Sequence, residues 1–373
     1  MTKARELADL IANVNNGSSL GNKNFIINGG MQVWQRATAA TAAVDGAYKT
    51  VDRFFNWVSG GGAYTTEKST GHLATTGHEN ALKVAVTTAD TSIAAGDYYV
   101  IGYKIEAQNL QSFKYGSSSA NAVTLSFWIR ATKTGTHTLF FSKNDSTQYI
   151  YVAEYTISAS NTWEHKTITI EPDSNIKAGA GAIANDNGAG ITIGFVLKEG
   201  STYEGATANA WNTAKYTTSN QVNNMDSTSN TWYLTGVQLE IGKATEFEVE
   251  AYEVTLRKCQ RYYEPHIHHS YTQAGMSYST TQFIIPYIWH VPKRAAPTFT
   301  FPTVGTSSGN LGVTTNTSSY PSTHGSVLRA VTQTTGHAYI YVNADDGWSG
   351  FTDDHVCWLY GYGSPVIEIS SEL

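Results

Sequence analysis

The chain has 373 residues, of which only 14% are charged, while glycine and tyrosine are abundant with 33 and 23 copies. This length rules out a disulfide-stapled miniprotein, and the composition favours short strands and turns over helices. The formal net charge of -6 comes without a long run of either sign, so we expect neither a nucleic-acid partner nor attraction to anionic lipid.

Residues 1–22 carry the pattern of a short amphipathic helix. Leu7, Leu10, Ile11 and Val14 recur at helical spacing, and an Asn-Asn-Gly stretch then stops the pattern. An isolated helix of about four turns is marginal in water, so this apolar stripe needs burial against another surface. We predict an attachment arm that docks on another protein through these four residues. A helix folded back on its own domain is the alternative.

Residues 23–248 alternate strand patterns with clusters of Gly, Asn, Asp and Ser. The expected strands are 81–86, 123–129, 149–155, 166–170, 191–195 and 232–239. Several alternate apolar with polar residues, and no ten-residue helices separate them, which excludes a parallel sheet with crossover helices. A jelly-roll β-sandwich is the architecture that buries so many one-faced strands. Trp128 and Trp232 are predicted to pack in its core.

Residues 249–265 change the apolar period. Tyr252, Leu256, Cys259 and Tyr263 fall on one stripe of a helix, and a Glu-Pro pair is expected to end it, because proline cannot donate and restricts its predecessor. We therefore predict a linker helix that joins two domains.

Residues 266–373 return to strand patterns with Thr-, Ser- and Gly-rich connections. The expected strands are 283–289, 298–301, 338–342 and 365–369. They predict a second, smaller β-sandwich as a C-terminal tip. The fold class is therefore mainly β, with an N-terminal amphipathic helix, a jelly-roll β-sandwich, a linker helix and a second smaller β-sandwich. The domain bounds are 1–22, 23–248, 249–265 and 266–373.

Several short blocks follow one another in a distinctive order. They are Asn24–Arg36, Val51–Phe54, Gly236–Gly242, Phe247-Glu248 and Cys259–Tyr263, with further blocks at 3–8, 291–298 and 367–373. Together they resemble a family of bacteriophage virion proteins, found in phages of aquatic bacteria and described as tail-fibre or structural proteins. The resemblance implies a jelly roll of carbohydrate-binding-module type, a C-terminal β-sandwich and, often, a homotrimer on a tail or capsid. It supplies no catalytic motif.

Aromatic and acidic residues in polar stretches are the candidates for glycan contact. Sugar-binding proteins stack pyranose rings on aromatic faces and add hydrogen bonds from acidic and amide side chains. The candidate glycan-contact residues are Trp211, Asp345, Asp346, Trp348, Asp353 and Asp354. A hard cation on the four acids is a second interpretation, and turn-forming, solvated acids are the third.

His266 and His268 follow the predicted linker helix. One chain offers too few well-spaced ligands here for zinc, but a trimer would bring six imidazoles together. That arrangement resembles the iron-binding His-x-His of some phage fibre tips; ordinary interface or surface histidines are the alternative. Cys259 and Cys357 are expected to be two buried thiols. We expect no cofactor and no metal other than this axial alternative.

The sequence contains no motif that places a nucleophile beside a base, and no phosphate-binding loop, so we expect a protein that is not an enzyme. Exposed edge strands and the unpartnered helix favour a homotrimer. Neither a membrane-spanning run nor a signal-peptide pattern is present. We expect a phage protein made in the host cytoplasm and carried on the virion surface. It would bind other virion proteins through its arm and host-surface polysaccharide through its loops. The alternatives are a capsid decoration protein without a receptor and a glycan-degrading tail enzyme.

Overall fold

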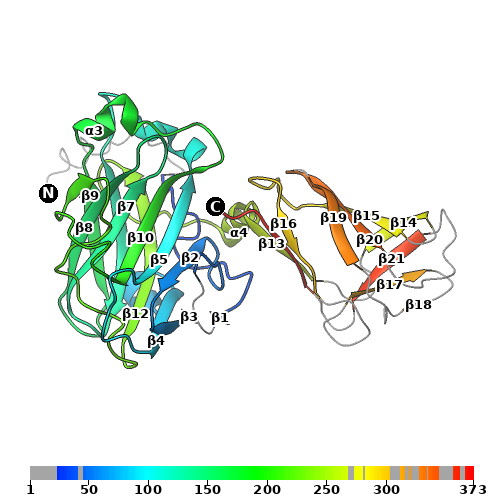
Figure 1. Cartoon of the computed structure of the whole chain (residues 1–373), viewed down its shortest axis with the longest axis horizontal. Helices are drawn as coiled ribbons and strands as arrows, with labels where there is room; N and C mark the ends of the chain where they lie inside the picture. Colours follow the sequence, from blue (N-terminus) through cyan, green and yellow to red (C-terminus); the bar gives the residue numbers. More distant parts are fainter. Residues whose placement is uncertain are drawn as a thin grey trace. The chain divides into compact units, whose positions relative to one another are not determined.

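The computed structural model describes most of the chain, in two units that are considered separately (Figure 1). The described residues are 23–40, 45–267, 273–279, 282–302, 311–315, 319–320, 327–333, 335–343, 356–361 and 366–373. The N-terminal unit comprises Met1–Thr255 with Leu373, and the C-terminal unit comprises Leu256–Glu372. The predicted arm, with Leu7, Leu10, Ile11 and Val14, lies outside the described residues. In the part of the chain that the structure describes, no helix is long and apolar enough to cross a bilayer.

Two six-stranded antiparallel sheets form the N-terminal unit (Figure 1). The first sheet has the order β1 (Ala39–Ala40), β3 (Ala63–Ser69), β4 (Ala81–Thr88), β12 (Thr231–Ile241), β6 (Val123–Ala131) and β9 (Glu164–Ile170). The second has the order β11 (Ala210–Asn212), β8 (Tyr149–Ile157), β7 (Gly135–Lys143), β10 (Ala189–Glu199), β5 (Tyr98–Glu106) and β2 (Phe54–Ser59). The helical turns between them are α2 (Leu73–Thr76), η1 (Ala107–Phe113), α3 (Ser174–Lys177) and η2 (Gly179–Gly181). The sequence predicted a mainly β fold of this kind, and all six expected strands lie at the observed ones.

The two sheets pack their apolar faces together. Phe127 of β6 lies 5.2 Å from Phe195 of β10 in an edge-to-face contact, and Trp232 of β12 lies 5.9 Å from Phe195. Trp232 is 1% exposed, as expected for the core. The prediction for Trp128 was wrong. Its neighbours along β6 point into the core, so the alternation of the strand turns Trp128 outward beside His165, with ring centres 5.1 Å apart.

Four of the blocks that carry the family resemblance, 24–36, 51–54, 236–242 and 247–248, meet in one polar network beside β12. The Asn24 side chain donates to the carbonyl oxygen of Val237 and accepts from the amide of Leu239, at 3.2 and 3.1 Å. Its backbone amide donates to the Glu248 carboxylate at 2.8 Å. Gly29 passes so close to Val237 that a Cβ would lie 2.0 Å from the carbonyl oxygen. These contacts therefore hold residues 24–29 against β12.

Asn28 makes four side-chain hydrogen bonds in this network. Its side chain donates to the carbonyl oxygens of Val33 and Asp52 and accepts from the amides of Gln32 and Val33, all within 3.1 Å. It is 4% exposed and has a φ of 64°, a conformation that asparagine tolerates better than alanine.

We expect Asn28→Ala to lower the free energy of unfolding by about 2–4 kcal/mol, because buried backbone groups lose their partners and the left-handed backbone becomes strained. Urea denaturation of the full chain measures this. Asn175→Ala, at an exposed asparagine, is the control and should cost about 0.5 kcal/mol or less. Equal losses in the two variants would contradict the role of Asn28.

The linker helix is shorter than expected. α4 covers Tyr252–Gln260, and Cys259 is buried in it, but Tyr263 begins strand β13 (Tyr263–Ile267). Pro265 lies within this strand instead of ending the helix. β13 is an edge strand whose neighbour is β22 (Val366–Ser370), and an edge strand tolerates proline because one row of its backbone groups needs no partner.

Two antiparallel sheets form the described part of the C-terminal unit. One has the order β13, β22 and β16 (Thr298–Thr300). The other has the order β18 (Ser319–Tyr320), β17 (Leu311–Thr315), β21 (Val356–Gly361), β14 (Gln273–Ser279), β15 (Gln282–Ile288), β20 (His337–Asn343) and β19 (Val327–Gln333). The sheets meet through aromatic rings: Trp289 lies 5.6 Å from Phe299, and His266 lies 4.7 Å from Tyr287.

Candidate functional site

The second sheet of the N-terminal unit is apolar on its outer face as well as on its inner one. Val100, Phe140, Ile150, Val152 and Val196 form a buried cluster there, with Trp57, Ala206 and Tyr216 packed against it. The five buried residues and Trp57 alternate with core residues along β2, β5, β7, β8 and β10. The segment between β10 and β11 and the residues after β11 supply partial cover. Trp57 and Tyr216, which pack against this buried cluster, remain partly accessible.

This surface is hollowed into an aromatic pocket of about 230 Å³. It is lined by Trp57, Tyr98, Val100, Phe140, Glu199, Tyr203 and Tyr216. The Trp57 and Phe140 rings are nearly parallel, at 21° and 6.3 Å, while Tyr216 meets Phe140 edge-on at 5.0 Å. Trp57 and Tyr216 are half-buried, so part of each ring remains accessible. Accessible ring faces around a cavity are suited to the C–H-rich face of a ligand.

A glycine lets the Phe140 ring lie flat at the base of this pocket. A Cβ on Gly194, the neighbour of Phe140 on β10, would lie 2.2 Å from two atoms of the ring. Any larger residue would therefore lift Phe140 into the cavity. The shape of the pocket thus depends on glycine, which has no side chain, at position 194.

Glu199, at the end of β10, contributes the buried acid of the pocket. It is 3% exposed, and among the described residues its Oε2 atom has no hydrogen-bond partner. Burial raises the pKa of Glu199 to about 8, and the nearby charge of Glu204 adds to the rise. At neutral pH the carboxyl is therefore mostly protonated. It can donate a hydrogen bond to one ligand oxygen and accept one from a ligand hydroxyl.

The contribution of Glu199 to the stability of the N-terminal unit should fall as the pH rises from about 4.5 to about 8. Over this range the folded state retains a proton on Glu199 that the unfolded state, with a pKa of 4.5, has lost. This contribution should fall by roughly 4 kcal/mol between pH 5 and pH 8.5, against the opposite slope that the lowered pKa values of His78 and His137 produce. In urea unfolding, the stability of Glu199→Gln relative to the original chain should therefore increase over this range, whereas Glu171→Gln, at an exposed acid, should follow the original chain. An unchanged slope in Glu199→Gln would contradict the assignment.

A second cavity, of about 440 Å³, lies near β12 and is lined in part by Leu73, His78, Phe247 and Val249. Burial lowers the pKa of His78 to about 4, and its neutral ring packs edge-on against Phe247, with centres 4.4 Å apart. Leu73, Val249 and Tyr252, which also line it, are exposed, so Tyr252 offers a single exposed ring, and the acid in the lining, Glu79, is exposed as well. We therefore take the aromatic pocket as the candidate ligand site.

Of the six candidate glycan-contact residues from the sequence, the structure describes Trp211. Trp211 of β11 is half-buried, its indole N–H donates to the carbonyl oxygen of Glu171 at 2.8 Å, and its ring packs towards the core beside Tyr151 and Phe141. It does not line the aromatic pocket. The other five candidate glycan-contact residues lie outside the described residues: Asp345, Asp346, Trp348, Asp353 and Asp354. A glycan role for these six residues stays a prediction.

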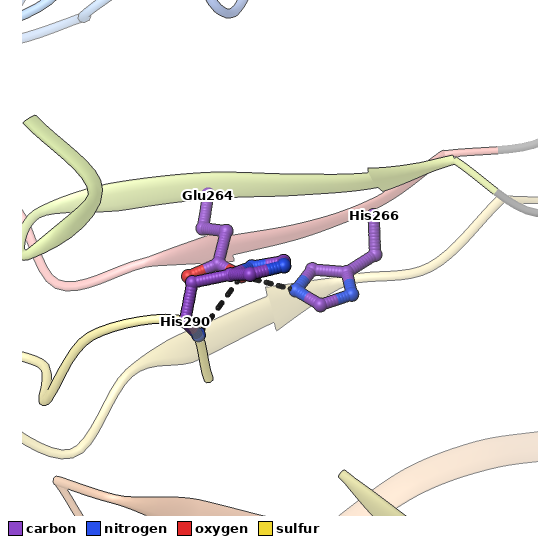
Figure 2. A group of neighbouring side chains, drawn as sticks. All are labelled: Glu264, His266 and His290. Carbon is purple, nitrogen blue, oxygen red and sulfur yellow. Dashed lines mark hydrogen bonds and ion pairs between the residues drawn. The ribbon is translucent and has the colours of Figure 1, made fainter. Parts of the chain in front are cut away.

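His266 lies in a second polar cluster, in the C-terminal unit, whereas His268 lies outside the described residues. Figure 2 shows the imidazoles of His266 and His290 beside the carboxylate of Glu264. Burial would raise the pKa of Glu264, but hydrogen bonds from His266 and Lys293, with the Lys293 charge, outweigh it and lower the pKa to about 2. Among the described residues, Glu264, His266 and His290 form a group that could hold a metal ion.

Residues of the aromatic pocket were not singled out by the sequence reasoning. One signal could have found them: β7 reads Leu139-Phe140-Phe141 and β10 reads Phe195-Val196-Leu197. Three consecutive apolar residues on an antiparallel strand indicate that both faces are covered. The pairing of these two strands then places Phe140 and Val196 on the same outer face.

Comparison with known proteins gave structural likenesses only, since no family model and no curated protein matches the chain. A family 11 carbohydrate-binding module of a cellulosomal cellulase from Clostridium thermocellum matches 56% of this chain and 99% of its own, at 12% identity and a TM-score of 0.29. A putative sugar-binding protein from Bacteroides thetaiotaomicron matches 59% and 100%, at 10% identity and a TM-score of 0.31.

A third likeness is the enzymatically active domain of tailspike protein 4 of bacteriophage CBA120. It matches 59% of this chain and 22% of its own, at 10% identity and a TM-score of 0.29. These solved structures thus include carbohydrate-binding modules and a phage tailspike domain. TM-scores this low leave the fold and the ligand to be argued from the chain's own geometry.

Proposed function

We propose that the N-terminal unit binds carbohydrate in the aromatic pocket on the outer face of its second sheet. The observation that carries this proposal is the combination of partly accessible rings with the buried carboxyl of Glu199, whose Oε2 has no hydrogen-bond partner among the described residues. A sugar offers the two complements: an apolar C–H face for the rings and hydroxyl groups for the acid.

The size of the pocket limits the ligand. Its volume of about 230 Å³ is below the roughly 300–1,000 Å³ of sites that enclose a drug-sized molecule. One sugar residue of a longer chain would fill it while the rest of the chain lay across the surface. Affinity for one site would be modest, so several copies on one particle would raise the apparent affinity by roughly two to four orders of magnitude.

The test is a panel of soluble host-type polysaccharides and plant glucans and galactans, screened by affinity electrophoresis and followed by calorimetry with oligosaccharides. The proposal expects retardation by at least one glycan and competition by its oligosaccharides. Absence of binding across the panel, together with unchanged reducing-sugar content, would count against it. Release of reducing sugar would instead support a glycan-degrading enzyme.

We further propose that the chain is a non-enzymatic phage virion protein at the particle surface, assembled as a homotrimer and docked through residues 1–22. This rests on the sequence blocks that resemble the virion family and on the exposed edge strand β13. Immunogold imaging of particles tests it. A few copies on a tail support adhesion, whereas tens to hundreds of copies on the head would indicate the alternative, a decoration protein that binds no receptor.

A further inference from the structure

Three potential metal ligands converge in the C-terminal unit without any part in the aromatic pocket. They are Glu264 and His266 of β13 and His290, which follows β15 (Figure 2). One ligand atom from each lies within 4.8 Å of the others. Glu264 and His266 are two residues apart on one strand, so they share a face. His290 reaches the same point from the other sheet.

Both imidazoles aim a ring nitrogen at the same carboxylate oxygen. Nε2 of His266 lies 2.6 Å from Oε1 of Glu264, and Nδ1 of His290 contacts that oxygen as well. Zinc takes nitrogen and oxygen ligands of this kind at about 2.0–2.2 Å. In a tetrahedral site the ligand atoms would be about 3.3 Å apart, so His266 would need to retreat by less than about 1 Å.

Lys293 occupies the other oxygen of the same carboxylate. Its ammonium group is fully buried and lies 2.6 Å from Oε2 of Glu264. This contact fixes the direction of the carboxylate and leaves Oε1 for a ligand role, which is how an outer-shell partner orients a metal ligand. The Lys293 charge also compensates the acid, so the affinity for a cation should be lower than in a site with an uncompensated carboxylate.

Access to the cluster is open on one side. Glu264 is buried and the His266 side chain is 16% exposed, but the His290 side chain is 67% exposed. An ion can therefore enter beside His290. With three protein ligands, a fourth position would remain for water or an external donor, as in open zinc sites.

We propose that Glu264, His266 and His290 form a binding site for a divalent transition-metal ion of the zinc class. The ion would join the three-stranded sheet to the seven-stranded sheet and so stabilise the C-terminal unit. Nitrogen and carboxylate donors in this number suit zinc better than calcium or magnesium, which prefer sites made of oxygen ligands.

Titration of the metal-free full chain with Zn²⁺ alone tests the site. We expect His290→Ala and His266→Ala each to weaken Zn²⁺ binding at least tenfold. Loss of an outer-shell partner already lowers metal affinity by about 10- to 100-fold, and loss of a ligand should lower it at least as much. His337→Ala, at another exposed histidine of the same unit, is the matched control and should bind as the original chain does. Excess Zn²⁺ should raise the melting temperature of the C-terminal unit, and His290→Ala should abolish this rise.

The test remains decisive if His266→Ala misfolds. His290 is exposed, so His290→Ala should fold like the original chain, and the circular dichroism spectrum of this variant checks that. Co²⁺ in place of Zn²⁺ should give the absorption of a four-coordinate site, which His290→Ala should remove. Zn²⁺ affinity that is unchanged in both variants would overturn the proposal. So would loss of Zn²⁺ binding only on His268→Ala, or no binding to the original chain at millimolar Zn²⁺.

Discussion

Trp57→Ala should weaken binding of the best glycan at least about 30-fold. Trp57 supplies a nearly parallel partner to Phe140 and an accessible face at the edge of the pocket. Aromatic residues that dominate a binding site contribute about 2 kcal/mol or more, and each 1.4 kcal/mol is tenfold in affinity. Calorimetry with the oligosaccharide that binds the original chain best measures the loss.

Trp163→Ala is the matched control for this experiment. Trp163 is also half-buried but lies beside the first sheet, where its ring packs against His72 and Tyr233. Its removal should leave glycan affinity within about twofold, since it lies outside the pocket. A reversed result, with binding lost in Trp163→Ala and retained in Trp57→Ala, would move the site to the opposite sheet.

Lys293→Met should lower the free energy of unfolding of the C-terminal unit by about 3–5 kcal/mol. The lysine is fully buried and pairs with Glu264, which is 1% exposed. Removing the lysine leaves the buried Glu264 carboxylate without its ion-pair partner, while the imidazoles of His266 and His290 still contact it, and breaking a buried pair costs this much. Scanning calorimetry of the metal-free full chain should show the transition of this unit shifted down by more than about 10 °C.

A second substitution distinguishes a charge effect from a packing effect. Lys293→Met combined with Glu264→Gln removes both charges, so it should recover a large part of the loss. Lys83→Met, which breaks a half-buried pair with Glu67 near the surface, should cost about 1 kcal/mol or less. If the double variant were no more stable than Lys293→Met, the buried charge would not be the cause.

Strand positions could be predicted from the sequence because period-two patterning is local. Residues 123–129 and 191–195 lie within β6 and β10 for this reason. Patterning does not say which strands pair, so the order of the sheets could not be deduced. The Glu-Pro pair at 264–265 failed as a helix stop, because whether a proline ends a helix or sits in an edge strand depends on β22, about a hundred residues away.

The candidate sites were harder to predict. Trp57 and Glu199 lie far apart along the chain and meet only because β2 and β10 both pair with β5. The buried state of Glu199, and hence its raised pKa, follows from tertiary packing. His266 was noted in the sequence, but its partners Glu264 and His290 come together through two different sheets.

The most direct test of the central claim is a crystal structure of the full chain with the oligosaccharide that binds it most tightly. We expect one sugar ring against Trp57 and Tyr216, with a hydroxyl group at hydrogen-bond distance from the Glu199 carboxyl. Electron density for the sugar beside Trp128 and Trp163, or in the C-terminal unit, with an empty aromatic pocket would contradict the proposed carbohydrate site.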